Sequence, residues 1–131
     1  MPRNLLKGLA TATLLLGAAS ANGASAAIIT LTCSDHVVNF ANTISGQKAV
    51  QNYSDSTTLA IDLSVKEYCW LCKGVWKQMY GYDDRIIVLW KYEVSSSYLI
   101  RQTGEWHITN SPDPKTGWRS EDVFHCSAPK L

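Results

Sequence analysis

Two cysteines separated by two residues, in the segment Cys69-Trp70-Leu71-Cys72, have the clearest potential for chemistry in this chain. A disulfide across this spacing closes a very short ring, and such bonds can be strained, reducible and reactive. One interpretation is a thiol–disulfide redox centre in which Cys69 is the nucleophile and Cys72 is the resolving thiol. The other is a static disulfide that closes a turn or loop, and the residues around the pair favour this second interpretation.

Residues 67–73 resemble the redox motif of thioredoxin-like proteins, which also place an aromatic residue before the first cysteine and often a lysine after the second. The strand expected at 58–66 stands where the thioredoxin strand would. The resemblance then ends, because Gly74 and Val75 follow where that family has a long helix whose dipole lowers the pKa of the first cysteine. The prolines within 112–114 lie in an expected loop, so none is a candidate for the family's cis-proline. A redox role for the pair is therefore the alternative hypothesis.

The N-terminal residues predict export. A basic start precedes an apolar run at 9–19, and small residues end in an A-x-A site at 24–26. These are the three parts of a secretory signal peptide, and the apolar run is too short to span a membrane. We therefore predict a signal peptide at 1–26 and a single exported β domain at 27–131, periplasmic or secreted, with no membrane span in the mature chain.

The charge of the mature chain is close to neutral. The signal peptide carries two of the 12 basic residues and none of the 11 acidic ones, which leaves a net charge of −1. Such a balance is no footprint for nucleic acid or for an anionic membrane. We therefore expect no nucleic-acid partner.

Export also changes how the other two cysteines are interpreted. An even number of cysteines in an oxidising compartment predicts disulfides, and four cysteines allow three pairings. We favour Cys33–Cys126 together with Cys69–Cys72. The first bridge would join the two ends of the mature domain and close a loop of about 90 residues, which on chain-entropy grounds stabilises the fold by about 4 kcal/mol.

Cys69 and Cys72 also have the spacing of half a zinc site, which His107, His125 or Cys126 could complete. No second pair of ligands stands at zinc-finger spacing, and an oxidising compartment favours disulfides over thiolates, so we predict no metal site. The chain also lacks the G-x-S-x-G, H-E-x-x-H, P-loop and dinucleotide-binding patterns. No cofactor and no catalytic residue are predicted, and the sequence favours a protein that is not an enzyme.

The elements that must position these residues are strands. In residues 58–66, apolar side chains at every second position from Leu59 to Val65 alternate with mostly small or polar ones, the pattern of a half-buried strand. We expect further strands at 28–33, 37–41, 85–94, 98–102, 105–109 and 121–126, an irregular one at 49–53, and turns or loops at 34–35, 42–57, 81–84, 95–97, 103–104 and 110–117. Many short strands predict an all-β fold, an antiparallel meander that forms a small barrel or a sandwich and is stapled by disulfides.

Five tryptophans and six tyrosines are many for a domain of this size. In a small barrel most such residues fill the core or close an end. Trp118, in the polar loop 111–120, and Trp70, between the two cysteines, are the tryptophans that we expect at the surface. Because tryptophan dominates binding hot spots, these two residues are the predicted binding residues.

The layout resembles small exported bacterial proteins of unassigned function, which have an early strand ending in a cysteine, a β meander and a late cysteine. The features that carry this resemblance are Cys33, the segment 98–106 with Arg101, and Cys126. It spans most of the mature chain, and the C-x-x-C pair looks like an addition to the pattern. The resemblance implies an all-β fold and nothing about activity. Periplasmic lysozyme inhibitors are similar in size, export and disulfide use, but their functional loop residues find no match here.

Together these features predict a non-catalytic binding module that contacts a protein or a cell-envelope component. An inhibitor of a secreted or envelope enzyme is one concrete form of this hypothesis. The contact region is expected at residues 110–119 and around Trp70. The alternative function is a thiol–disulfide oxidoreductase that uses Cys69 and Cys72.

Overall fold

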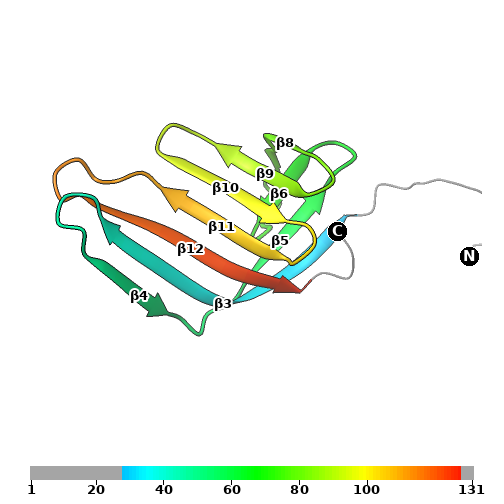
Figure 1. The fold of residues 1–131 in the computed structure, drawn as a ribbon. Coiled ribbons are helices and arrows are strands. Elements are labelled where there is room, and N and C mark those ends of the chain that lie inside the picture. The colour runs from blue at the N-terminus through cyan, green and yellow to red at the C-terminus, as the bar shows by residue number, and fades with distance from the viewer. Residues whose placement is uncertain (1–27, 128–131) are drawn as a thin grey trace, which may run out of the picture.

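Ten antiparallel strands form one continuous sheet in the computed structural model, which describes residues 28–127 (Figure 1). The strands are β3 (Ile29–Asn42), β4 (Lys48–Asn52), β5 (Thr57–Asp62), β6 (Glu67–Trp70), β7 (Lys77–Gln78), β8 (Gly81–Tyr82), β9 (Ile86–Lys91), β10 (Ser95–Ile100), β11 (Glu105–Asn110) and β12 (Trp118–Ser127). Their order across the sheet is β7-β6-β5-β3-β12-β11-β10-β9-β8, with β4 attached to β3.

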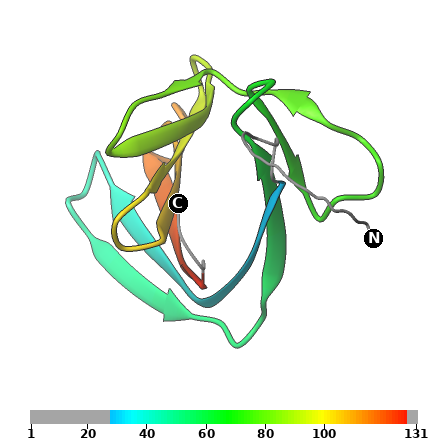
Figure 2. The same ribbon diagram turned by 90° about the vertical axis from the view of Figure 1, so that its right-hand side faces the viewer.

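The sheet curls into a half-barrel (Figure 2). The predicted all-β antiparallel fold is therefore confirmed, and of the two predicted shapes the molecule is closer to the barrel than to the sandwich. The predicted signal peptide, residues 1–26, lies outside the described residues.

The long strand β3 organises the sheet. It pairs with β12 along its length, with β5 through its first half and with β4 through its second half. The turn predicted at 34–35, between the strands expected at 28–33 and 37–41, is wrong, because both segments belong to β3. Asp35 has a φ of 51°, and the register against β12 shifts here by one residue, which is a β-bulge. The polar pair that looked like a turn bends the strand without reversing it.

The chain between β7 and β8 connects the two ends of the sheet at one rim. β7 pairs with β6, and β8 pairs with β9 at the other end of the strand order. Between them the Met79 N–H donates to the Lys66 carbonyl at 2.8 Å, and the Tyr80 N–H donates to the Val88 carbonyl at 3.1 Å. Met79 is 2% exposed and packs in the core. This short segment therefore satisfies backbone groups on both edges and curls the sheet at that rim.

The strand predicted at 58–66 ends earlier than expected. β5 stops at Asp62, and a turn that includes Lys66, with a φ of 57°, leads into β6. Val65, the last apolar residue of the alternating pattern, is 54% exposed. The alternation of apolar residues therefore continues past the end of the strand, into a turn where Val65 is not buried.

The turn predicted at 95–97 is also wrong. β10 begins at Ser95, and the chain turns at 92–94, where the Tyr92 N–H donates to the Ser95 carbonyl at 2.7 Å. Ser97 is fully buried, and its hydroxyl accepts a 2.7 Å hydrogen bond from the indole N–H of Trp106. A run of serines is typical of turns, but a buried indole donor needs an acceptor, and serine supplies one in little volume.

The turn predicted at 103–104, between the strands expected at 98–102 and 105–109, is confirmed, and it joins β10 and β11 as a hairpin. Gly104 has a φ of 76°, and a Cβ at this position would collide with the carbonyl oxygen of Cys126. Both the backbone conformation and the lack of space therefore require glycine. The closing strand predicted at 121–126 is present and is longer at both ends, as β12.

The predicted bridge between Cys33 and Cys126 is present across β3 and β12, with the Cα atoms 3.9 Å apart at paired positions. It belongs to the buried core, whose other members are Leu31, Leu59, Ile61, Tyr68, Met79, Ile87, Leu89, Leu99, Trp106, Ile108 and Phe124. The bridge joins the first and last strands of the domain at the point where both enter this core.

Candidate functional site

The cysteines of the C-x-x-C segment are joined by a disulfide, with their Cα atoms 4.8 Å apart. Cys69 lies on β6 and is 1% exposed, whereas Cys72 lies in the exposed chain that follows. Residues 71–76 form a turn and a loop. The helix dipole that lowers the pKa of the first cysteine in thioredoxin-like proteins therefore has no counterpart here. Cys69, the nucleophile of the redox alternative, is the buried member of the pair.

The disulfide ring displays the two residues that it encloses. Leu71 has a φ of 59°, a left-handed conformation that is uncommon for a bulky residue, and its N–H donates to the Thr58 carbonyl at 2.9 Å. The bridge fixes the chain on either side of Trp70 and Leu71. These two residues are 43% and 53% exposed. The sequence expectation that Trp70 lies at the surface agrees with this exposure.

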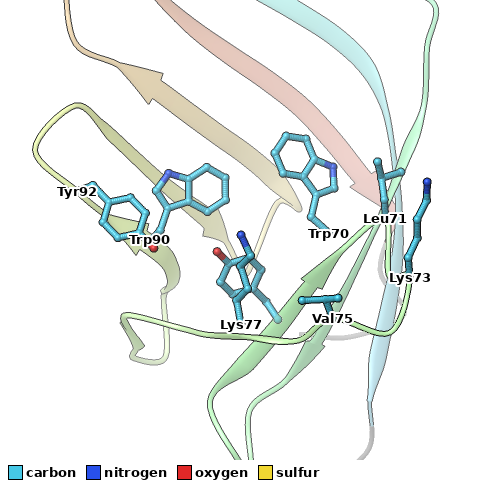
Figure 3. Close-up of a pocket in the computed structure, with 8 residues that line it drawn as sticks. Trp70, Leu71, Lys73, Val75, Lys77, Trp90 and Tyr92 are labelled. Carbon is cyan, nitrogen blue, oxygen red and sulfur yellow. The ribbon is translucent and has the colours of Figure 1, made fainter.

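Trp70 and Leu71 line a groove of about 520 Å³, which we call the aromatic groove (Figure 3). Trp90, on β9, and Tyr92, just after β9, line it from the other arm of the curled sheet. The loop between β6 and β7 crosses below the two indole rings in this view and contributes Lys73 and Val75, and Lys77 follows on β7. The full lining is Tyr68, Trp70, Leu71, Lys73, Val75, Lys77, Trp90 and Tyr92.

Stacked rings hold the two indoles of the groove in place. Trp70 lies nearly parallel to Trp90, with ring centroids 6.0 Å apart, and makes a T-shaped contact with the core residue Trp106, with centroids 5.1 Å apart. The indole N–H of Trp70 donates to the Thr57 hydroxyl, and that of Trp90 donates to the Ser95 hydroxyl, both at 3.0 Å. Both indole donors are therefore occupied, and the groove presents ring surface.

Positive charge accompanies this ring surface. Lys73 and Lys77 are the only charged side chains among the described residues that line the groove. Within residues 28–127 neither lysine forms an ion pair. Burial of the Tyr68 ring, and then repulsion from an ionised Tyr92, raise the pKa of the Tyr68 hydroxyl above its usual 10.0, so that it is protonated at neutral pH. The described lining is apolar and cationic.

Trp118, the other predicted binding residue, lies elsewhere. It is the first residue of β12, pairs with Asn42 and is 37% exposed beside a shallow hollow next to the 111–117 loop. Trp70 pairs with Leu59, which in turn pairs with Leu31 near the Cys33–Cys126 end of β3. The two tryptophans therefore belong to opposite ends of the long strands, and the structure does not bring them together.

Two histidines that look isolated in the sequence take part in polar clusters. The ring nitrogens of His36 lie 3.0 Å from an Asp55 carboxylate oxygen and 2.7 Å from an Asp122 carboxylate oxygen. The imidazole also stacks on Phe124 at 4.1 Å and on Tyr53 at 5.0 Å. His36 thereby ties the connection between β4 and β5 to β12 across β3.

His107 lies on the outer side of β11, opposite to the buried Trp106, between two carboxylates. Its nitrogens lie 2.8 Å from Glu105 and 3.2 Å from Glu121, and its ring stacks on Tyr98 at 4.8 Å. In the part of the chain that the structure describes, no three His, Cys, Asp or Glu side chains are arranged to hold a metal ion. The thiols of the zinc interpretation, Cys69 and Cys72, are consumed by the disulfide.

Sequence reasoning missed most of the groove. Trp90 and Tyr92 fall in the strand expected at 85–94, but nothing in the sequence indicated that this strand would meet Trp70. Lys73 lies in the loop before β7 and Lys77 lies on β7, so the positions of both depend on the pairing of β7 with β6. The sequence therefore indicated a strand or loop for each side of the groove separately. The contact between the two sides is set by the curl of the sheet.

Within residues 28–127, no helix is long and apolar enough to cross a membrane. Comparison with known protein families, with curated proteins and with solved structures found no significant match to this chain.

Proposed function

We propose that this protein is a non-catalytic binding module whose ligand contacts the aromatic groove. The observation that carries the proposal is the display of Trp70 at the end of β6, 43% exposed and fixed on three sides. It is held by the Cys69–Cys72 bridge, by the hydrogen bond to Thr57 and by the ring contacts with Trp90 and Trp106. A folded domain gains little stability from such exposure, whereas a preorganised aromatic surface lowers the entropic cost of binding.

The proposed setting is the periplasm or the secreted medium. Two disulfides in a domain of this size fit an oxidising compartment. The ligand is a protein or a cell-envelope component, and inhibition of a secreted or envelope enzyme is one form that such binding would take. We therefore place the contact region at the aromatic groove and no longer at residues 110–119, because Trp118 lies too far along β12 to share a small ligand with Trp70.

The oxidoreductase alternative has less support. The buried position of Cys69 restricts attack by an outside thiol, and a loop instead of a helix follows the pair. Its test is the reduction of a model protein disulfide by the purified chain, with Cys69→Ser as the control. Turnover that depends on Cys69 would make redox chemistry the function.

The binding proposal is tested by capture of partners from envelope extracts on immobilised protein. We expect Trp70→Ala to lose the captured component and Trp118→Ala, which removes a tryptophan of similar exposure at the far end of the sheet, to keep it. Circular dichroism of both variants checks that the fold is retained. Capture that persists in a folded Trp70→Ala variant would show that the groove is not the contact surface.

A further inference from the structure

The chemistry of the aromatic groove indicates the class of its ligand. We infer that the groove takes a single-chain amphiphilic anion, of which a fatty carboxylate is the simplest member. This inference rests on the binding function proposed above, with a cell-envelope component and not a protein as the ligand. The volume of about 520 Å³ lies within the range of about 300–1,000 Å³ in which small-molecule sites occur.

The hydrogen-bonding groups of the groove argue against a sugar or a peptide. Such ligands bring hydroxyl or amide donors that need acceptors when they are buried. Among the described lining residues, the only side-chain oxygens are the hydroxyls of Tyr68 and Tyr92, and no carboxylate or amide side chain is present. The indole donors of Trp70 and Trp90 are already bound to Thr57 and Ser95. An aliphatic chain has no such needs and gains by covering exposed ring surface.

The charges of the groove select the head group. Lys73 and Lys77 line the same groove, and no described ion pair engages either of them. Lys91, nearby on β9, lies 5.7 Å from the ring centroid of Tyr80 and so is placed over an aromatic face. Figure 3 shows Lys73 beside Leu71 and Lys77 below the two indole rings, with Val75 between them. An anionic head at either lysine would gain a charge-assisted hydrogen bond, whereas a cationic head would be repelled. The apolar lining residues Leu71 and Val75 lie beside these lysines and suit a chain that follows such a head.

The first test is isothermal titration of the disulfide-intact chain with three ten-carbon probes that share one chain and differ in head charge. These are decanoate, 1-decanol and decyltrimethylammonium, each below the concentration at which it aggregates. We expect decanoate to bind more tightly than the alcohol by about threefold, since one exposed ion pair contributes about 0.7 kcal/mol. The cation should bind more weakly than the alcohol. Equal binding of the three probes, or a preference for the cation, would overturn the inference.

Paired lysine variants locate the effect. Lys73→Gln with Lys77→Gln removes both cations of the groove, and should weaken decanoate binding by about threefold and leave 1-decanol binding unchanged. Lys48→Gln with Lys115→Gln removes the same charge from β4 and from the 111–117 loop, and should leave both affinities unchanged. All four residues are exposed, so folding should be unaffected. Equal weakening by both pairs would mean that net charge, not the groove, attracts the anion.

Two further results separate this inference from the function on which it rests. If Trp70→Ala loses its captured partner while the wild-type chain fails to bind decanoate, the ligand class is wrong and the binding module stands. If decanoate binds equally well to Trp70→Ala, the anion site is elsewhere and the inference fails. Vesicles of anionic phospholipid provide the last arm, because binding to vesicles without binding to free decanoate would indicate a membrane surface in place of a small ligand.

Discussion

Three tryptophans, Trp70, Trp90 and Trp106, each donate the indole N–H to a serine or threonine hydroxyl. The pairing lets a large ring be buried or half-buried without leaving its single donor unsatisfied. The depth of the pairs differs, because Trp106 and its acceptor Ser97 are both fully buried. Single-residue substitutions of the acceptors should therefore report the cost of an unpaired indole donor at different depths.

We expect Ser97→Ala to lower the free energy of unfolding by about 1–3 kcal/mol, since the Trp106 donor would be left unpaired in the core. Ser95→Ala removes the acceptor of the half-buried Trp90, where water can take its place, and should cost less than about 1 kcal/mol. Urea unfolding of the disulfide-intact variants measures both values. A Ser97→Ala loss no larger than that of Ser95→Ala would mean that the buried bond has no special weight.

The ionisation of Asp83 makes a contribution to the stability of the fold that depends on pH. Its carboxylate accepts hydrogen bonds from the N–H groups of Ile86 at 2.9 Å and Arg85 at 2.8 Å, and these bonds lower its pKa below the usual 3.8. A lowered folded-state pKa stabilises the fold above pH 3.8, and the contribution disappears as the pH falls through the folded-state value. Asp83→Asn should therefore lower the melting temperature at pH 7, and the difference from wild type should shrink towards pH 2.

Melting curves followed by circular dichroism between pH 7 and pH 2 test this expectation. The amide of asparagine keeps an oxygen that can accept the same two bonds, so the pH-dependent part of the difference isolates the charge. A difference between Asp83→Asn and wild type that is constant over the whole range would assign the effect to shape and not to ionisation.

At the scale of elements, the alternation of apolar residues located most strands, and turn chemistry was the weaker guide. The Gly104 hairpin was predictable because glycine at that position has one structural meaning. The polar segments 34–35 and 95–97 were each compatible with a turn or with a strand, and tertiary contacts decided between the two. Asp35 sits in a bulge, and Ser97 serves a buried indole. Local composition cannot distinguish a bend within a strand from a turn between strands.

The same limit explains the candidate site. That Trp70 and the two cysteines form one surface feature followed from their adjacency in the sequence. The opposite wall, Trp90 and Tyr92, comes from a strand at the other end of the sheet order, and it meets Trp70 only because the sheet curls. Contacts of this kind depend on the closure of the whole sheet, which no short pattern encodes.

Substitution of Gly104 tests how much the β10–β11 hairpin depends on its turn. Gly104→Ala adds a Cβ against the Cys126 carbonyl at a left-handed φ of 76°, and we expect a loss of more than about 3 kcal/mol. Gly46→Ala places the same methyl group at a φ of 78° in open space, so it should cost only the conformational share of about 1–2 kcal/mol. Denaturant unfolding compares the two. Equal losses would show that the collision relaxes at no cost.

In the whole molecule, an unbroken series of ring contacts crosses the half-barrel from one side to the other. Tyr53 stacks on His36, His36 on Phe124, and Phe124 on Trp106, which meets the edge of Trp70. The groove is therefore an exposed end of the aromatic core. A ligand that covers Trp70 extends this core without requiring a new arrangement of the fold, which is consistent with binding to a preformed surface.

The two disulfides should divide stability and binding between them. Cys33→Ala with Cys126→Ala opens a bridge between residues 93 apart and should cost about 4–5 kcal/mol, a large share of the stability of a small domain. Cys69→Ala with Cys72→Ala opens a bridge across three residues and should cost only about 2 kcal/mol. Because the short ring fixes Trp70 in the groove, this second variant should stay folded and lose most of its ligand.

Parallel measurements of urea unfolding and of ligand capture decide the point. A short-ring variant that unfolds as readily as the long-loop variant would make both bridges structural staples. A short-ring variant that keeps its fold and its full affinity would show that the ring contacts with Trp90 and Trp106 suffice to orient Trp70. A C-x-x-C bridge closes so short a loop that it stabilises the fold only slightly through chain entropy. Its main physical effect is then to hold Trp70 in position at the groove. If so, the short-ring variant should lose capture and retain its fold.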